Sequence, residues 1–206
     1  MIRPRLALAL TGLAATVLVL AGCGGSVGGD AAIVGPVAIR EPVLASQVAE
    51  VHRGNAAPVD QDDPTLVQST LRRLILQELV AQVASANNVW VTRTQLDQEL
   101  AALDAQMGGR AELDKALLQS NIPPSQLEDY LTFQLRLDGL GPVLAPDGDD
   151  AAQQQAVIAA VADQAATVGV TINPRFGTWD QSQLNLGPSP DDLSIPQPVT
   201  KPAPAA

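Results

Sequence analysis

The sequence predicts a mainly α-helical fold, and three observations support this prediction. Only 2% of the 206 residues are aromatic, which suits helix seams lined by Leu, Val and Ala better than a β-sandwich core. Residues 65–88 form one long stretch whose apolar residues recur at steps of three and four, as on one face of a helix. Shorter stretches with similar spacing follow it, separated by Gly, Pro and Asn residues that end helices. We therefore expect helices packed around the long stretch.

The start of the long stretch carries clear signals for a helix. Asp63 can accept hydrogen bonds from the unpaired backbone N–H groups of a first turn, and Pro64 has no N–H group to leave unpaired. Leu76 and Val80 widen the apolar stripe, so we expect neighbours on more than one side. At about 1.5 Å per residue, such a helix would exceed roughly 30 Å, about the diameter of a small domain.

Two short β-like pieces are expected at the two ends of the helical region. Residues 31–39 are rich in Val and Ile but contain Pro36, which favours an edge strand or a hairpin-like bend. A short helix should open at Glu41 and stop at Gly54. The second β-like piece, residues 170–172, comes far along the chain. We predict that the two pieces pair with each other and close the domain.

Four further helices are expected between the long helix and the second β-like piece. The expected starts are a capping-box-like sequence at Thr94, Arg110, a near-capping box at Ser125 and the acidic run 147–150. Gly and Pro residues 139–142 should end the third of these helices.

The first 22 residues are predicted to be a lipoprotein signal peptide. They combine Arg3 and Arg5, an apolar run over residues 6–20 that is shorter than the roughly 20 residues of a spanning helix, and small residues before the only cysteine. Leu20-Ala21-Gly22-Cys23 resembles a bacterial lipobox, in which the cysteine carries a diacylglyceryl group and becomes the new N-terminus. This predicts lipidation of Cys23 and anchoring at the extracytoplasmic face of the bacterial cell membrane. The alternative is an ordinary secreted protein with an unpaired cysteine.

Composition divides the rest of the chain into three parts. Residues 23–30 are glycine-rich and should form a flexible, lipid-anchored linker. Residues 31–180 carry the helical and β-like patterns and form the expected domain. Residues 181–206 are predicted to be a Pro-rich disordered tail.

The residues offer little that suggests catalysis. His52 is the only histidine, which excludes a multi-histidine zinc site, and we expect it to be a solvated residue at a helix C-terminus rather than part of a triad. The acidic runs 60–63 and 147–150 lack the Glu at position 12 of a calcium-binding EF-hand loop and are expected to cap helices instead. A net charge of −10 argues against binding to nucleic acid. We therefore predict no enzyme, no metal and no cofactor.

Arg175 is unusual because it lies close to two aromatic residues, Phe176 and Trp179. We expect it to form a cation–π contact or a backbone clamp inside the fold. The alternative is a rim that contacts a bound peptide.

The order of the elements resembles the N-terminal domain of the SurA family of extracytoplasmic chaperones and its relatives among PrsA-type lipoprotein foldases. The resemblance covers about residues 31–180 and runs through these segments: Asp63-Pro64-Thr65-Leu66, Arg73 to Leu79, Val91 to Asp97, Leu113, Leu117, Ile122, and Leu127 to Leu135. Family members often carry a parvulin prolyl-isomerase domain between their last two helical parts. Only residues 141–150 lie in that interval, far fewer than the roughly 50 residues of a small domain. Isomerase activity is therefore not expected.

The resemblance implies a SurA-like helical module that holds unfolded or exported polypeptides in an apolar groove, without ATP. Exposed aromatic and Met side chains suit such recognition, and the candidates, each of which could instead belong to the core, are Trp90, Met107, Tyr130, Phe133 and Trp179. An alternative function is a non-catalytic adaptor for one partner in the cell envelope. A third, a prolyl isomerase, lacks the domain that it would need.

Overall fold

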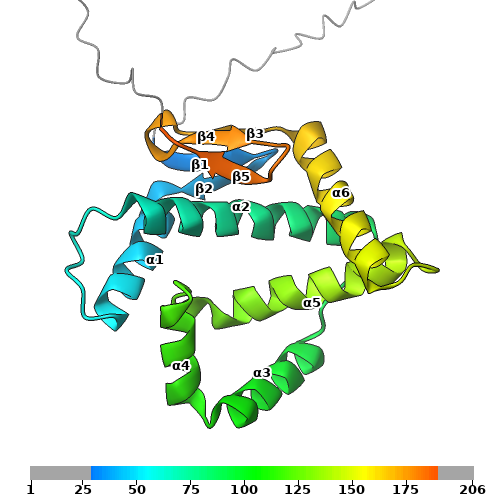
Figure 1. Ribbon diagram of the computed structural model, residues 1–206, viewed down its shortest axis with the longest axis horizontal. Coiled ribbons are helices and arrows are strands. Elements are labelled where there is room, and N and C mark those ends of the chain that lie inside the picture. The colour runs from blue at the N-terminus through cyan, green and yellow to red at the C-terminus, as the bar shows by residue number, and fades with distance from the viewer. Residues whose placement is uncertain (1–28, 190–206) are drawn as a thin grey trace, which may run out of the picture.

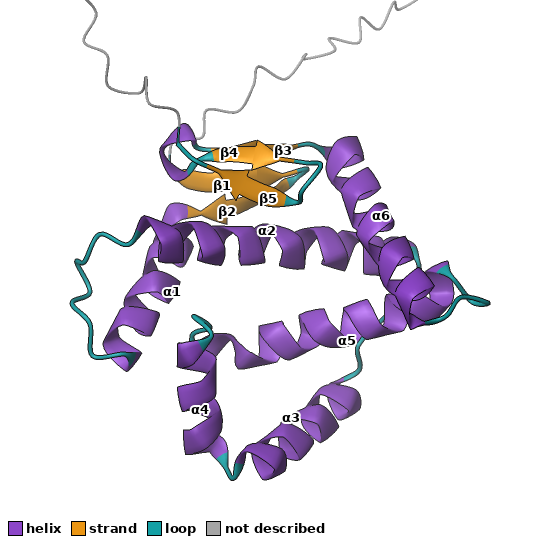
Figure 2. Ribbon diagram, in the orientation of Figure 1, coloured by secondary structure: helices purple, strands orange, loops and turns teal. Residues whose placement is uncertain are grey.

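The computed structural model describes residues 29–189 and is organised around α2 (Pro64–Ala86), the expected long helix. Figure 1 shows α2 running across the molecule, with the strands above it and α5 below it. The helices are α1 (Glu41–Gly54), α2, α3 (Arg93–Met107), α4 (Arg110–Gln119), α5 (Leu127–Leu144) and α6 (Asp150–Val168), with two short 3-10 turns, η1 (Pro124–Gln126) and η2 (Pro174–Phe176). Helices dominate the chain (Figure 2), so the predicted mainly α fold is confirmed.

Helix α2 begins as its sequence predicts. Asp63 accepts a hydrogen bond from the backbone N–H of Leu66 at 2.9 Å, and Pro64 occupies the first turn. At about 1.5 Å per residue its 23 residues span roughly 34 Å. Its buried side chains contact α1, the strands, α5 and α6, and the largest are Leu66, Leu71, Ile75, Leu79, Val80 and Val83.

A three-stranded antiparallel sheet joins the two ends of the helical region. Its strand order is β2-β1-β3, with β1 (Asp30–Val34) in the middle. Strands β1 and β2 (Val37–Arg40) form a hairpin whose turn is Gly35-Pro36, as the Pro in this run suggested. Strand β3 (Val170–Ile172) pairs with the other edge of β1, with Ile33 opposite Thr171. The predicted pairing of the two β pieces is therefore confirmed.

The folded region is longer at both ends than the expected residues 31–180. Asp30 belongs to β1 rather than to a linker. Beyond residue 180, the chain turns back and β5 (Asn185–Gly187) pairs with β4 (Thr178–Asp180), with Leu186 opposite Trp179. The predicted start of the tail at residue 181 is wrong, because Leu186 is buried in the main core. The rest of that tail, and the predicted signal peptide, lie outside the described residues.

Three helix boundaries also differ from the prediction. Ser125 does not cap α5, which begins at Leu127 after η1, and its hydroxyl donates to Glu50 instead. Helix α3 is capped by Thr92, which forms a capping box with Gln95, so it starts before the expected Thr94. Helix α5 continues past Gly139 and through Pro142 to Leu144. Because glycine has no Cβ, α5 can lie close to its neighbours at these positions. A Cβ at Gly139 would lie 2.8 Å from Val89, and one at Gly141 would lie 3.0 Å from Gln153 of α6. Packing against these neighbours explains why the helix continues where the local sequence suggests a stop.

The buried apolar residues form two clusters. The main core joins the strands, α1, α2, α6 and the C-terminal part of α5. The second core joins α3, α4 and the N-terminal part of α5, with Leu96, Leu113, Leu117, Ile122, Leu127 and Leu131 at its centre. Figure 1 shows α3 and α4 below α5, on the side away from the sheet.

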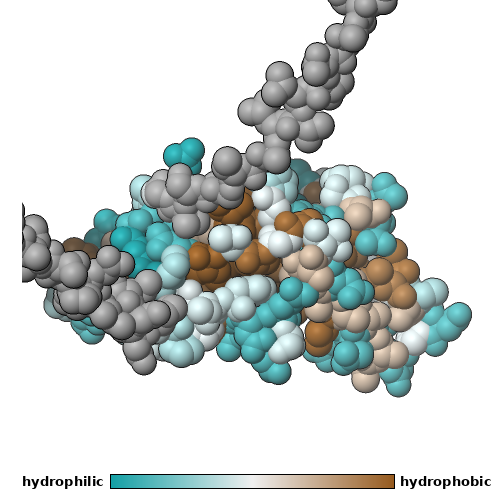
Figure 3. All heavy atoms as spheres, turned by 90° about the horizontal axis from the view of Figure 1, so that it is seen from above, coloured by the Kyte–Doolittle hydropathy of each residue, from teal (hydrophilic) through white to brown (hydrophobic). Residues whose placement is uncertain are grey.

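Part of the surface on the sheet side of the molecule is apolar. Seen from above, apolar residues gather near the middle of this face, with hydrophilic residues around them (Figure 3).

None of the helices within residues 29–189 is both long and apolar enough to span a membrane.

Candidate functional site

A groove of about 350 Å³ lies where β2, the start of α1, α2 and α5 meet. We call it the β2–α5 groove. Its apolar lining residues are Ala38, Ile39, Val43, Leu74, Ala81 and Phe133, and its polar and charged ones are Arg40, Gln77, Glu78, Asp129, Thr132 and Arg136. The lining includes as many cationic side chains as anionic ones, so it presents no net formal charge.

The side of α2 that lines the groove is mixed, with Leu74 and Ala81 beside Gln77 and Glu78. Leu71, Ile75 and Leu79 are fully buried in the main core. Leu74 and Ala81, at helical spacing on another side of α2, line the groove and are only partly buried. Leu76 and Val80, the residues expected to widen the apolar stripe, both contact the main core, so the groove is formed by another side of α2.

Next to the groove, a chain of polar side chains separates the two cores. We call it the polar seam; it comprises Gln47, Glu50, Arg73, Ser125 and Gln126. Arg73 donates to the side-chain oxygen of Gln47 at 3.0 Å, and Gln47 donates to that of Gln126 at 3.0 Å. The Glu50 carboxylate accepts from the backbone N–H and hydroxyl of Ser125 at 2.9 and 2.6 Å. The two cores are thus joined partly by directional polar contacts rather than by continuous apolar packing.

Arg73 is the electrostatic centre of this seam. Burial lowers the pKa of its guanidinium from the ordinary value, because desolvation penalises the charged form. The nearby Asp129 and, to a smaller extent, Tyr130 oppose this shift. Asp129 lines the groove, so a charged side chain of the groove acts electrostatically on Arg73 of the seam.

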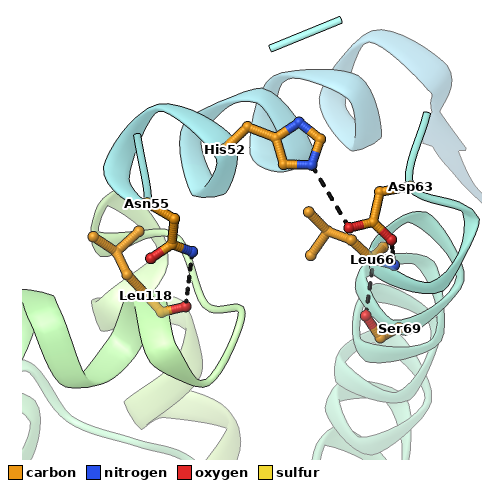
Figure 4. Close-up of polar contacts among 6 residues, drawn as sticks. All are labelled: His52, Asn55, Asp63, Leu66, Ser69 and Leu118. Atoms are coloured by element: carbon orange, nitrogen blue, oxygen red, sulfur yellow. Dashed lines mark hydrogen bonds and ion pairs between the residues drawn. The ribbon is translucent and has the colours of Figure 1, made fainter. Parts of the chain in front are cut away.

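His52 is not the solvated residue that the sequence suggested. It is 4% exposed, and its Nε2 lies 3.8 Å from Asp63 Oδ2, at the N-terminus of α2 (Figure 4). Among the described residues neither ring nitrogen has a hydrogen-bond partner. His52 follows Val48 by four residues, which places it on the inward face of α1. That spacing, visible in the sequence, could have predicted its burial.

A second contact in the same region joins the end of α1 to α4, one of the helices of the second core. The side-chain amide of Asn55, just after α1, donates to the backbone carbonyl of Leu118 in α4 at 3.4 Å (Figure 4). Gly54 lies so close to the Leu118 side chain that a Cβ at this position would overlap with it. The C-terminal end of α1 therefore contacts both α2 and α4.

The structure places the five predicted contact residues in separate regions. Phe133 alone lines the groove. Tyr130 and Met107 pack against the second core, and Trp179 packs against the main core. Trp90 is 64% exposed, in the connection between α2 and α3. The sequence did not indicate the groove residues of β2 and α1, including Val43, which is 46% exposed.

The other charged positions singled out in the sequence have structural roles. Asp149 accepts from the backbone N–H of Ala152 at 2.9 Å and so caps α6, as Asp63 caps α2. Arg175 lies 4.5 Å over the Phe176 ring and forms an ion pair with Glu41. It thus joins the C-terminal segment to the start of α1, which supports the clamp interpretation. Cys23, the predicted lipidation site, lies outside the described residues.

No protein-family model matches this chain, and no match is found among curated proteins or solved structures. The resemblance to SurA N-terminal domains therefore stays a prediction.

Proposed function

We propose that this protein is a membrane-anchored, extracytoplasmic lipoprotein that holds unfolded or exported polypeptides without catalysing a reaction on them. The observation that carries the proposal is the β2–α5 groove, where Val43, Leu74 and Phe133 are incompletely covered. Contiguous exposed apolar surface rimmed by polar groups is typical of protein-binding sites. The lipobox-like sequence at Cys23 and the resemblance to SurA-type chaperones point to the same compartment and role.

The chemistry of the groove suits a ligand of variable sequence. Val43, Leu74 and Phe133 offer non-directional apolar contact, which depends on area rather than on one side-chain shape. The balanced charges of the lining select neither acidic nor basic segments. His52 lies at the opposite end of α1 from Val43 and does not line the groove. Binding is therefore a better description of this site than acid–base catalysis.

The proposal is tested by the ability of residues 24–206 to suppress aggregation of a chemically unfolded model protein. Val43→Asp should weaken suppression several-fold, because it places a carboxylate on the apolar lining. Val43 lies in the first turn of α1, where an acidic side chain is compatible with the helix dipole, so the fold should be retained. Val59→Asp is the matched control, because Val59 is 52% exposed in a loop and does not line the groove. No suppression by the wild-type protein at several-fold molar excess would contradict the proposal.

One observation favours the alternative function, an adaptor for a single envelope protein. Trp90 is the most exposed of the large apolar side chains in the described part of the chain and lies outside the groove. Exposed Trp residues are frequent hot spots of specific interfaces. Saturable binding to one folded partner, lost in Trp90→Ala and absent for denatured proteins, would favour the adaptor. Turnover of a prolyl-peptide substrate would instead favour the isomerase.

A further inference from the structure

We infer that the β2–α5 groove takes its ligand as an extended polypeptide segment that pairs, as an added strand, with the free edge of β2. This inference rests on the proposed function and specifies how the groove would hold a client.

The hydrogen-bond register of the sheet identifies the free edge. Gly35 donates to the Gly169 carbonyl and Asn173 donates to the Ala31 carbonyl, each at 3.0 Å. Residues 31, 33 and 35 of this segment therefore direct their backbone groups towards β3, and residues 32 and 34 direct theirs towards β2. Ala32 and Val34 lie opposite Ile39 and Val37.

It follows that Ala38, between these two residues of β2, directs its backbone N–H and C=O away from β1. Within residues 29–189, no other strand pairs with this edge and no hydrogen bond to these two groups is found. Ala38 is also exposed. The backbone N–H and C=O of Ala38 are thus available to pair with the backbone of an added strand.

The free edge opens directly onto the groove. Ala38, Ile39 and Arg40 of β2 all line it. Val43, which lines the groove, is 46% exposed, and Val37, the first residue of β2, is 38% exposed. A strand placed along β2 would therefore gain main-chain hydrogen bonds from the edge and apolar contact from Val43, Leu74 and Phe133, which is the combination used in recognition by strand addition.

These features define the occupant as an extended segment with apolar side chains at alternate positions. Alternate side chains of a strand point to opposite faces, so one set can enter the groove while the other faces solvent. The balanced charges of the lining give no preference for a charged segment. Because a folded protein rarely offers a free extended segment, this mode would distinguish unfolded clients from folded ones.

The short length of β2 limits the strength of this pairing. Pro36 and Arg40 bound the edge, and Pro and charged side chains at such positions discourage long edge-to-edge association. We therefore expect contact with about four residues of a client, matching the four residues of β2. Brief, reversible contact of this kind suits a holdase.

The first test replaces Ala38 and measures binding of a fluorescently labelled, uncharged peptide of alternating Val and Ser residues by fluorescence anisotropy. Ala38→Pro removes the outward N–H and places a ring on the edge, while leaving the bonds to β1 intact, as Pro is tolerated where the N–H faces solvent. We expect binding at least roughly tenfold weaker. Ala38→Ser, which keeps the N–H, is the matched control and should bind as the wild type does. Circular dichroism establishes that both variants fold.

The second test leaves the protein unchanged and modifies the peptide. N-methylation at alternate residues removes the N–H groups on one edge of the peptide, so methylation of the edge that faces β2 should abolish binding, and methylation of the other edge should not. Equal binding of both methylated peptides and of the unmodified peptide would overturn the inference.

The inference and the proposed function can fail separately. If Val43→Asp weakens suppression of aggregation but Ala38→Pro and N-methylation change nothing, the groove holds clients without strand pairing and the inference is wrong. If the peptide binds in an Ala38-dependent way but unfolded proteins still aggregate, the strand-addition site is supported and the holdase function is wrong.

Discussion

Replacing His52 by Leu should increase the free energy of unfolding, although it removes the only histidine of the chain. In its neutral form the imidazole carries one donor and one acceptor. Both ring nitrogens are buried and have no hydrogen-bond partner among the described residues. A buried polar group without a partner costs about 1–3 kcal/mol, and His52→Leu removes this cost.

Two effects reduce the gain in free energy of unfolding expected for His52→Leu. The Nε2–Oδ2 distance of 3.8 Å to Asp63 is too long for a hydrogen bond, and with the Asp63 side chain 33% exposed the attraction is worth less than about 1 kcal/mol. The change of side-chain shape costs roughly another 1 kcal/mol. We therefore expect a net stabilisation of about 1 kcal/mol, or about 2–4 °C in Tm for a domain of this size.

Urea denaturation followed by circular dichroism measures this change, with substitutions of Asp63 as controls. Asp63→Asn keeps an oxygen that can cap α2 and should leave the stability nearly unchanged, whereas Asp63→Ala should lose about 1 kcal/mol. A loss of more than about 1 kcal/mol in His52→Leu would refute the reasoning, because it would mean that the imidazole makes a contact worth more than its burial costs.

Three further predictions follow from the structure. Leu79→Ala, at a fully buried position of α2, should lower the free energy of unfolding by about 2–5 kcal/mol in urea denaturation, and a loss below about 1 kcal/mol would mean that the site is not tightly packed. Hydrogen bonds from the hydroxyl of Ser182, and from the backbone N–H groups of Gln183 and Ser182, lower the pKa of Asp180. Because this folded-state pKa is depressed, the stabilisation of the β4–β5 turn should be present above about pH 3.9 and lost as pH falls further through the folded value. An NMR titration of the Ser182 amide measures this, and a midpoint above about pH 4 would contradict it. Cys23→Ala should abolish incorporation of an alkyne-tagged fatty acid in cells, and label retained by the variant would disprove the predicted lipidation site.

The parts of the fold that could be predicted are those set by neighbouring residues. Asp63 and Pro64 define the start of α2, and the spacing of Leu71, Ile75 and Leu79 defines its buried face. The pairing of β1 with β3 could be predicted because the short β-like piece at residues 170–172 needs a partner for its backbone groups, and residues 31–39 are the other β-like piece.

The parts that could not be predicted depend on how distant elements meet. The β2–α5 groove takes residues from four elements, so its lining is determined by the placement of α5 beside α2 and not by any local pattern. The β4–β5 hairpin has strands of only three residues, too short to show an alternation, and its buried Leu186 stands in a Pro-rich context. The five candidate contact residues share only a side-chain type, aromatic or Met. Of these five, Phe133 alone lines the groove, because side-chain type does not determine where a residue lies in the fold.

The place of β1 in the middle of the sheet has a consequence for the order in which the protein can fold. Strand β1 is synthesised early and can form its hairpin with β2 at once, but its other edge stays open until Ile172 has been made. Pairing of β1 with β3 closes a loop that contains helices α1 to α6, and closing so long a loop slows folding. During that interval the nascent protein itself exposes an unpaired strand, the kind of segment that associates with other chains. Synthesis of β3 is therefore the step that ends this period of vulnerability.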